Sequence, residues 1–578
     1  MKRAGRARAP RTRPRWGSID HVVGISSTAR GAALAYLGRD GTVRASALER
    51  WAGVAPCLLL ADDEEREIRE GRSPVGAVLR DGLVEAFGTF PPTRAFEVVF
   101  PLWLDWLLRD LPVRAGDVDL VVTGDGYFAT SPARLGRCLH RWLPGARVVA
   151  ALDQHAGLRR QAFWPSGFDE AAVVTLDAGA EPLDRLGGRR LAATVARRTR
   201  ARGWEVLAEL CDDPESNAGL AFETFCRHLG LHQCEQNLVG PLAAGGGPAL
   251  LDRLAADLRL APDGSVRFLA PPALRAALAD WVPPRAAGAP PEPRHRDVAH
   301  AAQEILARIV GHLVRSARAL SGCDRLAFAG EVAANAAARA AAAGALPPSE
   351  LFVPGEPGDR GQALGCALYG AHEVARWPGR GRAPEPTGPC YDEDEMLAAA
   401  EAGGLCARRP DDADRELCRR LVRGEIVALF AGGAPLSDRP PGARTLLADP
   451  RRPAPGARGG TPDAVVLAES VEDWFESPPD GVRGHGTARP RRTLPGLRGP
   501  VAVWPVAAGS APLRGPLEAF FEASGLPLLA AAPLLGRGGA PAETPEDAVD
   551  ALTAGAADAL LLGRYLTTPA GAGGRVPR

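Results

Sequence analysis

Short apolar runs separated by turn residues open the patterned part of the chain. They span residues 21–26, 31–37 and 42–46, and the Asp40-Gly41 pair between the last two runs is a strong hairpin signal. Apolar runs of this length, bounded by turn residues, are typical of buried strands. The pattern therefore predicts a β-meander at the start of the chain.

The meander pattern occurs twice. The second copy begins at 171–176, breaks at 177–181 and resumes at 190–195 and 204–210. The other predicted helices and strands of this region lie at 74–87, 97–111, 119–123, 132–143, 146–150, 217–231, 297–320, 325–329 and 361–375. Two meanders, each followed by helices, predict an α/β protein with a duplicated ribonuclease-H-like fold. This is the actin-like ATPase arrangement, in which the nucleotide lies between the halves.

Two stretches rich in Pro and Gly, at 283–293 and 377–389, interrupt the pattern, and the second predicts a domain boundary. Helices and strands after it are predicted at 414–421, 425–430, 501–506, 517–524, 526–530 and 545–554, with a loop at 431–461. The predicted organisation is a disordered Arg/Pro-rich arm, a first domain, a linker, a second α/β domain and a tail, at residues 1–16, 17–376, 377–389, 390–570 and 571–578.

The composition indicates which partners and which phosphate-binding groups to expect. Among the 578 residues, 69 basic side chains balance 69 acidic ones, so no nucleic-acid partner is indicated. Lys2 is the only lysine, and phosphate groups would have to be recognised by arginine, backbone N–H groups or helix N-termini. None of the ten cysteines forms a C-x-x-C pair, which favours reduced thiols and a cytoplasmic location. No apolar run is long enough to predict a secretory signal or a membrane span.

Several segments, in order along the chain, resemble the NodU/CmcH-type O-carbamoyltransferase family. They are FWPSGFDEAAVVTLD at 163–177, LAFAGEVAAN at 326–335, GDRGQALGCA at 358–367, RTLLADPR at 444–451, GTAR at 486–489 and TPEDA at 544–548. Each segment is a weak signal by itself, but the ordered set covers nearly the whole chain. On these segments the chain is identified as a divergent member of that family.

The resemblance implies a TsaD-like first domain and a YrdC-like C-terminal domain. It implies a reaction that begins with carbamoyl phosphate and ATP, passes through carbamoyl-adenylate, and transfers the carbamoyl group to a hydroxyl of a small metabolite in a biosynthetic pathway. The implied cofactors are ATP and a divalent metal, Fe or Mg, and an inactive protein would need none. The expected partners are carbamoyl phosphate, the hydroxylated metabolite, and either a second copy of the chain or an intact homologue; no nucleic acid and no membrane are expected.

The resemblance also assigns candidate site residues. Asp177 and His155 are the candidate catalytic groups, and Asp359 is the candidate metal ligand, for which capping of the Gly358-Asp359 turn is the alternative. The candidates for binding nucleotide or carbamoyl phosphate are Gly179, Glu181, Gly330, Asn335, Gly361, Arg439, Arg444, Arg451 and Arg489. The four arginines could form a cluster of guanidinium forks around an anion, or they could be solvated surface side chains.

The chain departs from the family at several of these positions. The two metal-binding histidines of the family, spaced i and i+4, fall on Gln154 and Leu158, and His155 between them should face elsewhere by helical spacing. A glutamate, Glu331, replaces the second glycine of a double-glycine loop, and the apolar segment 531–535 stands where the family has a nucleotide loop. Enzymatic activity is therefore left open. The alternatives are a catalytically impaired binding or partner subunit, or transfer to an amine.

Overall fold

The computed structural model describes most of the chain between residues 18 and 569. The described ranges are 18–26, 32–51, 95–124, 139–177, 191–199, 203–211, 218–231, 236, 238–243, 245–261, 264–346, 350–378, 387–436, 442–452, 463–476, 486–492, 494–497, 501–508, 512–536 and 541–569. The N-terminal arm, the helix predicted at 74–87, the tail at 571–578 and three site candidates, Gly179, Glu181 and Arg439, lie outside the described residues.

The first sheet contains five strands in the order β3-β2-β1-β4-β5. Its strands are β1 (His21–Ser26), β2 (Ala33–Gly38), β3 (Val43–Ala47), β4 (Leu120–Gly124) and β5 (Arg147–Leu152). The first three form the predicted antiparallel meander, and β4 and β5 run parallel to β1. The short helices α1 (Leu48–Trp51) and η1 (Ala115–Asp117) flank it, and α4 (Ala95–Leu107) packs its aromatic and leucine side chains on one face.

The second sheet repeats this topology, with strand order β12-β11-β6-β7-β8. Its strands are β6 (Glu170–Leu176), β7 (Leu191–Thr199), β8 (Gly203–Cys211), β11 (Leu326–Ala329) and β12 (Leu351–Phe352). The first three again form an antiparallel meander, and β11 and β12 are again parallel to its first strand. Strand order and directions agree between the two sheets, and this confirms the duplicated, ribonuclease-H-like arrangement predicted from the two meanders.

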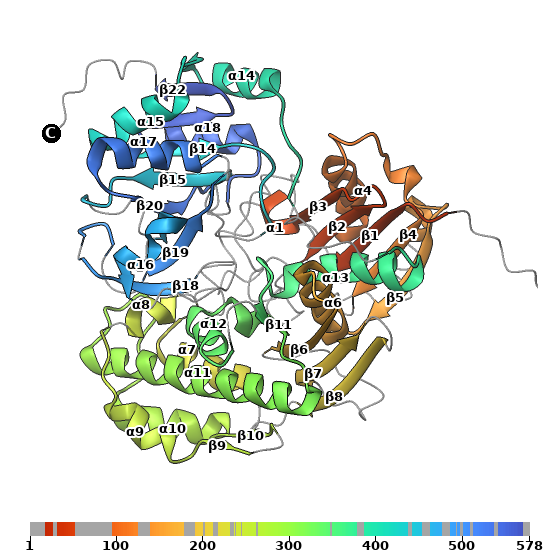
Figure 1. Cartoon of the computed structure of the whole chain (residues 1–578), viewed down its shortest axis with the longest axis vertical. Helices are drawn as coiled ribbons and strands as arrows, with labels where there is room; N and C mark the ends of the chain where they lie inside the picture. The colour runs from red at the N-terminus through yellow and green to blue at the C-terminus, as the bar shows by residue number, and fades with distance from the viewer. Residues whose placement is uncertain are drawn as a thin grey trace, which may run out of the picture.

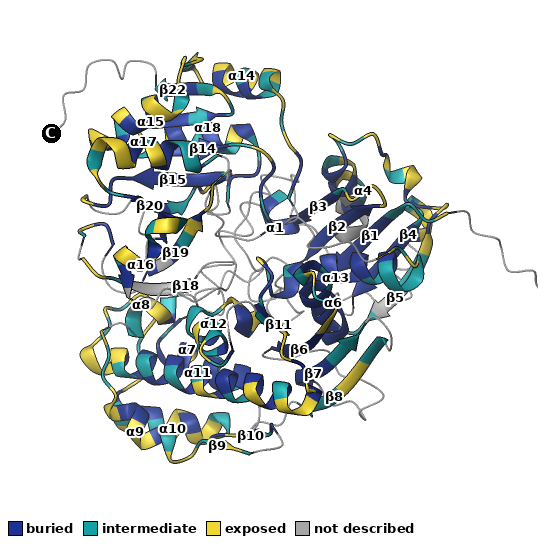
Figure 2. Ribbon diagram, in the orientation of Figure 1, coloured by how far each residue is buried: buried dark blue, intermediate teal, exposed yellow. Residues whose placement is uncertain are grey.

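One face of the second sheet is covered by helices that surround α11 (Pro293–Ser321), a helix of 29 residues. The other elements of this region are α7 (Ala218–His228), α8 (Val239–Ala243), α9 (Ala249–Ala255), α10 (Pro271–Trp281), η4 (Glu331–Ala334), α12 (Ala336–Ala343) and the hairpin β9 (Arg259–Leu260) and β10 (Val266–Arg267). Buried and exposed residues alternate along these helices, as the colours of Figure 2 show. The helical patterns predicted at 217–231 and 297–320 are thereby confirmed.

Two helices lie side by side between the sheets: α6 (Gln154–Ser166), and α13 (Gln362–Tyr369) with its π-helical continuation η7 (Gly370–Val374) (Figure 1). Helix α13 packs on the first sheet and α6 on the second. They approach closely because glycines meet at the crossing. A Cβ on Gly365 would lie 2.0 Å from the carbonyl oxygen of Gly157, and one on Gly24 of β1 would lie 2.0 Å from that of Ala363. The close packing expected of the small-residue helix at 361–375 is confirmed.

The C-terminal part is built on a mixed sheet of ten strands, in the order β13-β22-β21-β14-β15-β20-β16-β19-β18-β17. The strands are β13 (Leu405–Arg408), β14 (Val427–Phe430), β15 (Arg444–Ala448), β16 (Asp463–Leu467), β17 (Phe475–Glu476), β18 (Gly486–Pro490), β19 (Val501–Val506), β20 (Leu528–Pro533), β21 (Ala559–Leu562) and β22 (Tyr565–Pro569). The helices are α14 (Glu393–Ala402), α15 (Ala413–Val422), α16 (Val471–Trp474), α17 (Arg514–Ser524) and α18 (Pro545–Thr553).

One prediction for this part is wrong. The stretch 431–461 is not all loop, because β15 is a buried strand paired with β14 and β20. Its five residues lie between segments rich in Gly, Pro and Arg, and these segments dominate the average composition of residues 431–461. The segment 531–535, aligned with a nucleotide loop, likewise begins inside β20, where Ala531 and Ala532 pair with Leu447 and Leu446.

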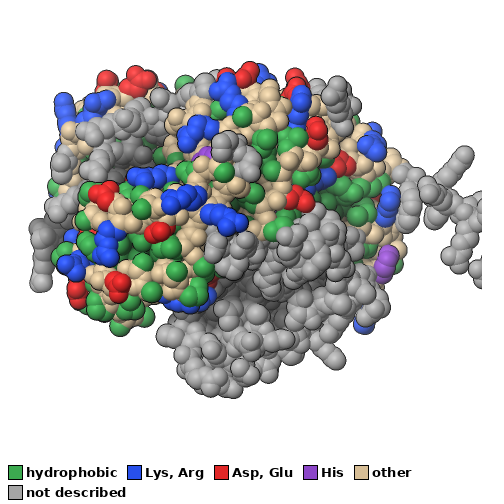
Figure 3. All heavy atoms as spheres, turned by 90° about the horizontal axis from the view of Figure 1, so that it is seen from below, with side chains coloured by type: hydrophobic (Ala, Val, Ile, Leu, Met, Phe, Trp, Pro, Cys, Tyr) green, Lys and Arg blue, Asp and Glu red, His purple; other side chains and the backbone are tan. Residues whose placement is uncertain are grey.

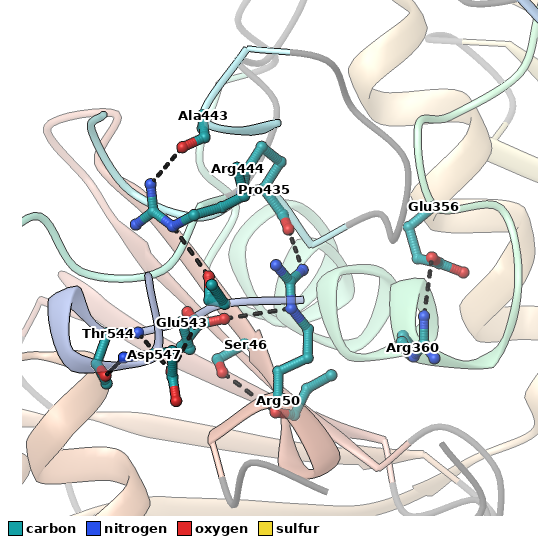
Figure 4. A network of polar contacts seen from close by, with 12 residues as sticks. Ser46, Arg50, Glu356, Arg360, Pro435, Ala443, Arg444, Glu543, Thr544 and Asp547 are labelled. Carbon is teal, nitrogen blue, oxygen red and sulfur yellow. Dashed lines mark hydrogen bonds and ion pairs between the residues drawn. The ribbon is translucent and has the colours of Figure 1, made fainter. Parts of the chain in front are cut away.

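Backbone hydrogen bonds and a buried ion pair join the N-terminal and C-terminal parts. The N–H of Ala45 on β3 donates to the carbonyl of Thr387 at 2.9 Å, and the N–H of Gly388 donates to the carbonyl of Ala434 at 2.8 Å. Nearby, Arg50 of α1 pairs with Glu543, which precedes α18, at 3.2 Å between Nε and Oε2 (Figure 4). Both side chains are 3% exposed. The first sheet and the C-terminal sheet are therefore connected at this edge.

The described part of the face drawn in Figure 3 carries no single dominant charge. Basic and acidic side chains are interspersed over the described part of the face drawn in Figure 3, in keeping with the balanced charge of the chain. None of the helices in the described ranges combines the length and the apolarity that a bilayer crossing requires.

Candidate functional site

Polar residues follow the ends of the strands in the second sheet. Asp177 comes directly after β6, and Gly330 comes directly after the parallel strand β11. The carboxyl ends of neighbouring parallel strands meet at one edge of a sheet, which is where α/β proteins place their ligands. The N-terminus of α6 and the 3₁₀ turn η6 (Asp359–Gly361) reach the same edge, because both contact Asp177 or its neighbour Glu331.

Gln154 joins the two aspartates of this cluster. Its amide nitrogen Nε2 lies 2.6 Å from Oδ1 of Asp359 and 3.4 Å from Oδ2 of Asp177. All three side chains are buried, with exposed fractions of 6%, 8% and 4% for Gln154, Asp359 and Asp177. The first contact is a short hydrogen bond to a carboxylate, and the second is long and weak. Gln154 is thus held at the first position of α6, next to the N-cap residue Asp153.

Glu331 closes the cluster from the other side. Its backbone N–H donates to Oδ2 of Asp177 at 3.3 Å, and its carboxylate oxygen Oε1 accepts from the backbone N–H of Asp359 at 2.8 Å. The glutamate that replaces a family glycine is therefore stabilised by a backbone hydrogen bond at the start of η6. Four segments, ending or beginning at Gln154, Asp177, Glu331 and Asp359, are tied together by these contacts.

Two of the candidate glycines are required by close backbone contacts. Gly330 has a φ of +105°, and a Cβ there would lie 2.0 Å from the carbonyl oxygen of Leu176. A Cβ on Gly361 would lie 2.2 Å from the carbonyl oxygen of Glu356 and 2.4 Å from Oε1 of Gln161. Both glycines therefore have a structural role, because they let the main chain approach its neighbours closely at the cluster. A role in binding would be additional to this structural role.

His155 does not point toward the two aspartates. It is fully buried, with Nδ1 2.7 Å from Oγ1 of Thr175 and Nε2 3.1 Å from the carbonyl oxygen of Leu191. Both ring nitrogens are thus hydrogen-bonded to the second sheet, and burial lowers the pKa of the imidazole to about 4. Helical spacing indicated that His155 faces away from the Gln154 side, and the contacts agree with that expectation. The described contacts of His155 thus lie within the second sheet and do not include Asp177 or Asp359.

Asn335 serves as the N-cap of α12. Its side-chain oxygen accepts hydrogen bonds from the backbone N–H groups of Ala337 and Ala338, at 2.9 and 3.1 Å. These bonds satisfy donors that the first turn of a helix leaves unpaired. The described contacts of Asn335 are therefore structural, and its role in binding nucleotide or carbamoyl phosphate stays a prediction.

The proposed arginine cluster is not formed by the arginines whose side chains the structure describes. Arg444 is buried, and its guanidinium donates to the carbonyl oxygens of Ala431, Gly432, Ala443 and Ala542, at 2.7 to 3.0 Å (Figure 4). Arg451 makes a two-pronged ion pair with Asp449, at 2.6 to 3.0 Å. Arg444 therefore has internal acceptors for its guanidinium, whereas Arg451 pairs with Asp449 while its side chain stays 45% exposed. Arg439 and the side chain of Arg489 lie outside the described residues.

Burial explains the state of Arg444. Its loss of hydration lowers the pKa to about 10, and the nearby Glu543 carboxylate partly counteracts that effect. The guanidinium stays charged at neutral pH, and its Cζ atom lies 3.5 Å from the centre of the Phe430 ring. Arg444 thus holds Ala431, Gly432 and Ala443 at the C-terminal sheet.

The residues at the two positions where the family has metal-binding histidines do not fit a metal. Gln154 directs an N–H donor, not a lone pair, at Asp359, and Leu158 is fully buried in an apolar cluster with Phe163, Val173 and Ala327. Within the described ranges, no group of three or more His, Cys, Asp or Glu side chains could hold a metal ion. Asp359 is the first residue of the turn η6, and its carboxylate accepts a hydrogen bond from Gln154, so its role as a metal ligand or as a cap stays a prediction.

A shallow hollow lies next to the cluster. It has a volume of about 560 Å³ and is lined by residues of α6 and β8, together with the α6 cap: Asp153, Arg159, Val206, Leu207, Ala208 and Glu209. Asp153 accepts a hydrogen bond from the N–H of Ala156, so its side chain belongs to the helix cap. The hollow is thus adjacent to Gln154 but separate from the two aspartates.

The sequence did not predict the contacts of two members of this cluster. Gln154 was named only as a position where the family has a histidine, found by counting back from the segment 163–177, and Glu331 only as a replaced glycine within the segment 326–335. The replacement of a family residue was in each case the only signal.

The topology of the two equivalent sheets, with a polar cluster at the strand ends of the second, defines the class of protein: an α/β protein with a duplicated actin-like core. Solved structures resemble it only weakly. A dehydratase activator, component A of (R)-2-hydroxyglutaryl-CoA dehydratase from Acidaminococcus fermentans, aligns with 62% of this chain and 99% of its own, at 11% identity and a TM-score of 0.33. HypF from T. kodakarensis aligns with 62% of this chain and 48% of its own, at 14% identity and a TM-score of 0.30.

Two curated proteins are more similar to this chain in sequence than these two solved structures are. The nodulation protein NolO of Bradyrhizobium diazoefficiens is 29% identical over 350 residues, which is 57% of this chain and 61% of NolO. The nodulation protein NolNO of Sinorhizobium fredii is 28% identical over 352 residues, which is 57% of this chain and 49% of NolNO. The chain thus spans about half to three fifths of the curated relatives that it matches. No family model matches the chain.

These relatives confirm the resemblance to the NodU/CmcH-type carbamoyltransferases. The chain is a divergent homologue of NolO and NolNO over the residues that align with them.

Proposed function

We propose that this protein is an O-carbamoyltransferase that modifies a hydroxyl group of a small metabolite. The observation that carries the proposal is the similarity to NolO and NolNO. It is supported by the two buried carboxylates at the strand ends of the second sheet, where a ligand of an α/β protein binds. The duplicated core at residues 17–376 would carry the transfer step, and a YrdC-like domain at 390–570 would carry the activation step.

The proposed reaction has two steps. Carbamoyl phosphate, ATP and water give carbamoyl-adenylate, inorganic phosphate and pyrophosphate. The oxygen of the acceptor hydroxyl then attacks the carbamoyl carbon, and AMP leaves with the electron pair of the broken C–O bond. The hydroxyl proton must be taken up at that moment, and a carboxylate within hydrogen-bond reach is a suitable base. Asp177 and Asp359 are the groups that we propose for this role.

Binding of the phosphate groups is proposed to depend on the main chain. With Lys2 as the only lysine, backbone N–H groups are the principal donors available besides arginine. Gly330 and Gly361 allow the main chain to approach closely at the cluster, as their contacts show. No step is assigned to a metal, because the Gln154 amide does not fit one.

The first test is the release of pyrophosphate. Purified protein is incubated with ATP and carbamoyl phosphate, with and without Mg²⁺ or Fe²⁺, and pyrophosphate is measured with a coupled assay. We expect pyrophosphate that depends on carbamoyl phosphate. The matched control is Asp177→Asn, which removes a proposed base from the transfer site and should leave this first step intact, because activation is assigned to the C-terminal domain.

A different result would lead to the alternative function. If no pyrophosphate forms and ATP does not raise the melting temperature, the proposal of carbamoyl transfer is wrong. A binding or partner subunit of an intact homologue would then be the better description, and co-purification with such a homologue is the experiment that follows.

A further inference from the structure

The position of Gln154 suggests how the two buried aspartates are accommodated. A pair of carboxylates this deeply buried needs a nearby positive group or hydrogen-bond donors. Here a side-chain N–H₂ group reaches both, at 2.6 Å and 3.4 Å. We propose that the Gln154 amide occupies the place of a cation between Asp177 and Asp359, so that this chain holds its carboxylate pair by a neutral internal donor.

The orientation of the amide follows from the chemistry of its neighbours. If the amide were turned over, its oxygen would lie against carboxylate oxygens, and two acceptors at hydrogen-bond distance repel each other. With nitrogen toward them, each amide hydrogen has an acceptor. An amide nitrogen has no lone pair to offer a metal, so a cation could enter only after the amide turned and gave up both hydrogen bonds.

Surrounding contacts hold Gln154 in this position. The first turn of α6 is fixed by its cap, because Oδ1 of Asp153 accepts from the N–H of Ala156 at 2.8 Å. Asp177 and Asp359 are each tied to Glu331, one through its backbone N–H and the other through its carboxylate. Gln154 is therefore a positioning residue that sets the distance between the two aspartates.

The inference is tested by metal binding, independently of any reaction. Mn²⁺ is titrated into the wild-type protein, bound Mn²⁺ is followed by electron paramagnetic resonance, and melting temperatures are recorded in parallel. The wild type should show no stoichiometric Mn²⁺ binding and no saturable rise in melting temperature. In Gln154→Glu the donor becomes a third carboxylate, so the variant should melt at a lower temperature and should recover as Mn²⁺ binds the folded state.

A matched variant separates this effect from general damage. Gln161 lies on the same helix and is fully buried, but its amide donates to the carbonyl oxygens of Glu356 and Pro357 instead of to carboxylates. Gln161→Glu should therefore lower the melting temperature without recovery by Mn²⁺. If Gln154→Glu does not fold, the titration of the wild type with Mn²⁺ still tests the inference, because the wild type should bind no stoichiometric Mn²⁺.

Stoichiometric Mn²⁺ binding by the wild type that is lost in Asp359→Asn would overturn the inference. So would an equal response of Gln154→Glu and Gln161→Glu to Mn²⁺. Neither outcome bears on pyrophosphate release, so failure of this inference is distinguishable from failure of the proposed carbamoyl transfer.

Discussion

Burial determines which polar side chains near the candidate site can contact a ligand. His155 is the histidine nearest to the candidate site in the sequence, yet its ring is hydrogen-bonded on both sides within the core of the second sheet. Helical spacing was enough to predict that it faces away from the Gln154 side. The hydrogen bonds of Gln154 and Glu331 were not predictable in the same way, because they depend on loops from four segments meeting at one place.

The buried imidazole should make folding sensitive to acid. Burial lowers the pKa of His155 from 6.5 to about 4, so the unfolded chain takes up a proton before the folded protein does. Stability is then lost as the pH falls below the unfolded value of 6.5 toward 4. The loss should reach about 3 kcal/mol, because one pKa unit corresponds to about 1.4 kcal/mol. Urea unfolding across this pH range measures it.

His155→Gln should remove this part of the pH dependence, because glutamine does not titrate. His140 is exposed, and His140→Gln serves as the control that should leave the profile as it is in the wild type. A His155→Gln profile as steep as that of the wild type would mean that other groups cause the acid sensitivity.

At the scale of elements, the two meanders and the long helices α7 and α11 were predictable, whereas other regular elements, such as α6, α10 and β16, were not predicted. The two meanders appear in the sequence as apolar runs with turn residues between them, and the structure places strands at both. Strand β15 was missed because its flanks are rich in Gly, Pro and Arg. Helix α13 was expected to pack closely, but the partner that it meets, α6, could not be read from local pattern.

The crossing of α6 and α13 should be intolerant of side chains. In Gly365→Ala the new methyl group would lie 2.0 Å from the carbonyl oxygen of Gly157, so the two helices must move apart. We expect a loss of about 2–3 kcal/mol in the free energy of unfolding, which is typical of overpacking. Chemical denaturation of the variant measures it.

Gly116→Ala is the matched control for that substitution. Gly116 is exposed, and a Cβ there would meet nothing within 4 Å. Its substitution should change the stability by less than about 0.5 kcal/mol. Equal stabilities of Gly365→Ala and Gly116→Ala would show that the helices can separate at little cost.

At the scale of the whole molecule, one ion pair connects parts that are distant in the sequence. Arg50 and Glu543 are both buried, and Arg444 lies near enough to Glu543 to act on it electrostatically. Burial raises the pKa of the Glu543 carboxyl, and the two arginines partly offset that rise. Sequence patterns carry no information on such a pair, because neither residue shows which distant segment it meets.

Breaking this pair should be costly. Glu543→Gln or Arg50→Met leaves the remaining partner buried without its counter-charge, which typically costs about 3–5 kcal/mol. The double variant should lose less than the sum of the two single losses, with a coupling energy of about 1–3 kcal/mol. A double-mutant cycle followed by urea unfolding measures the coupling.

The exposed pair of Arg39 and Asp20 provides the comparison, with side chains 53% and 41% exposed. Arg39→Ala should cost less than about 1 kcal/mol, since exposed ion pairs contribute little. If the losses in unfolding free energy of Arg50→Met and Glu543→Gln simply add in the double variant, the two side chains act independently.

The backbone contacts of Thr387 and Gly388 limit how a reactive intermediate can travel. These two residues hydrogen-bond to β3 on one side and to Ala434 on the other. A large rotation of the C-terminal part would have to break these backbone hydrogen bonds. If carbamoyl-adenylate forms there, as proposed, transfer without such a rotation requires the intermediate to diffuse to the strand ends of the second sheet, and its rate of hydrolysis in water would limit the yield.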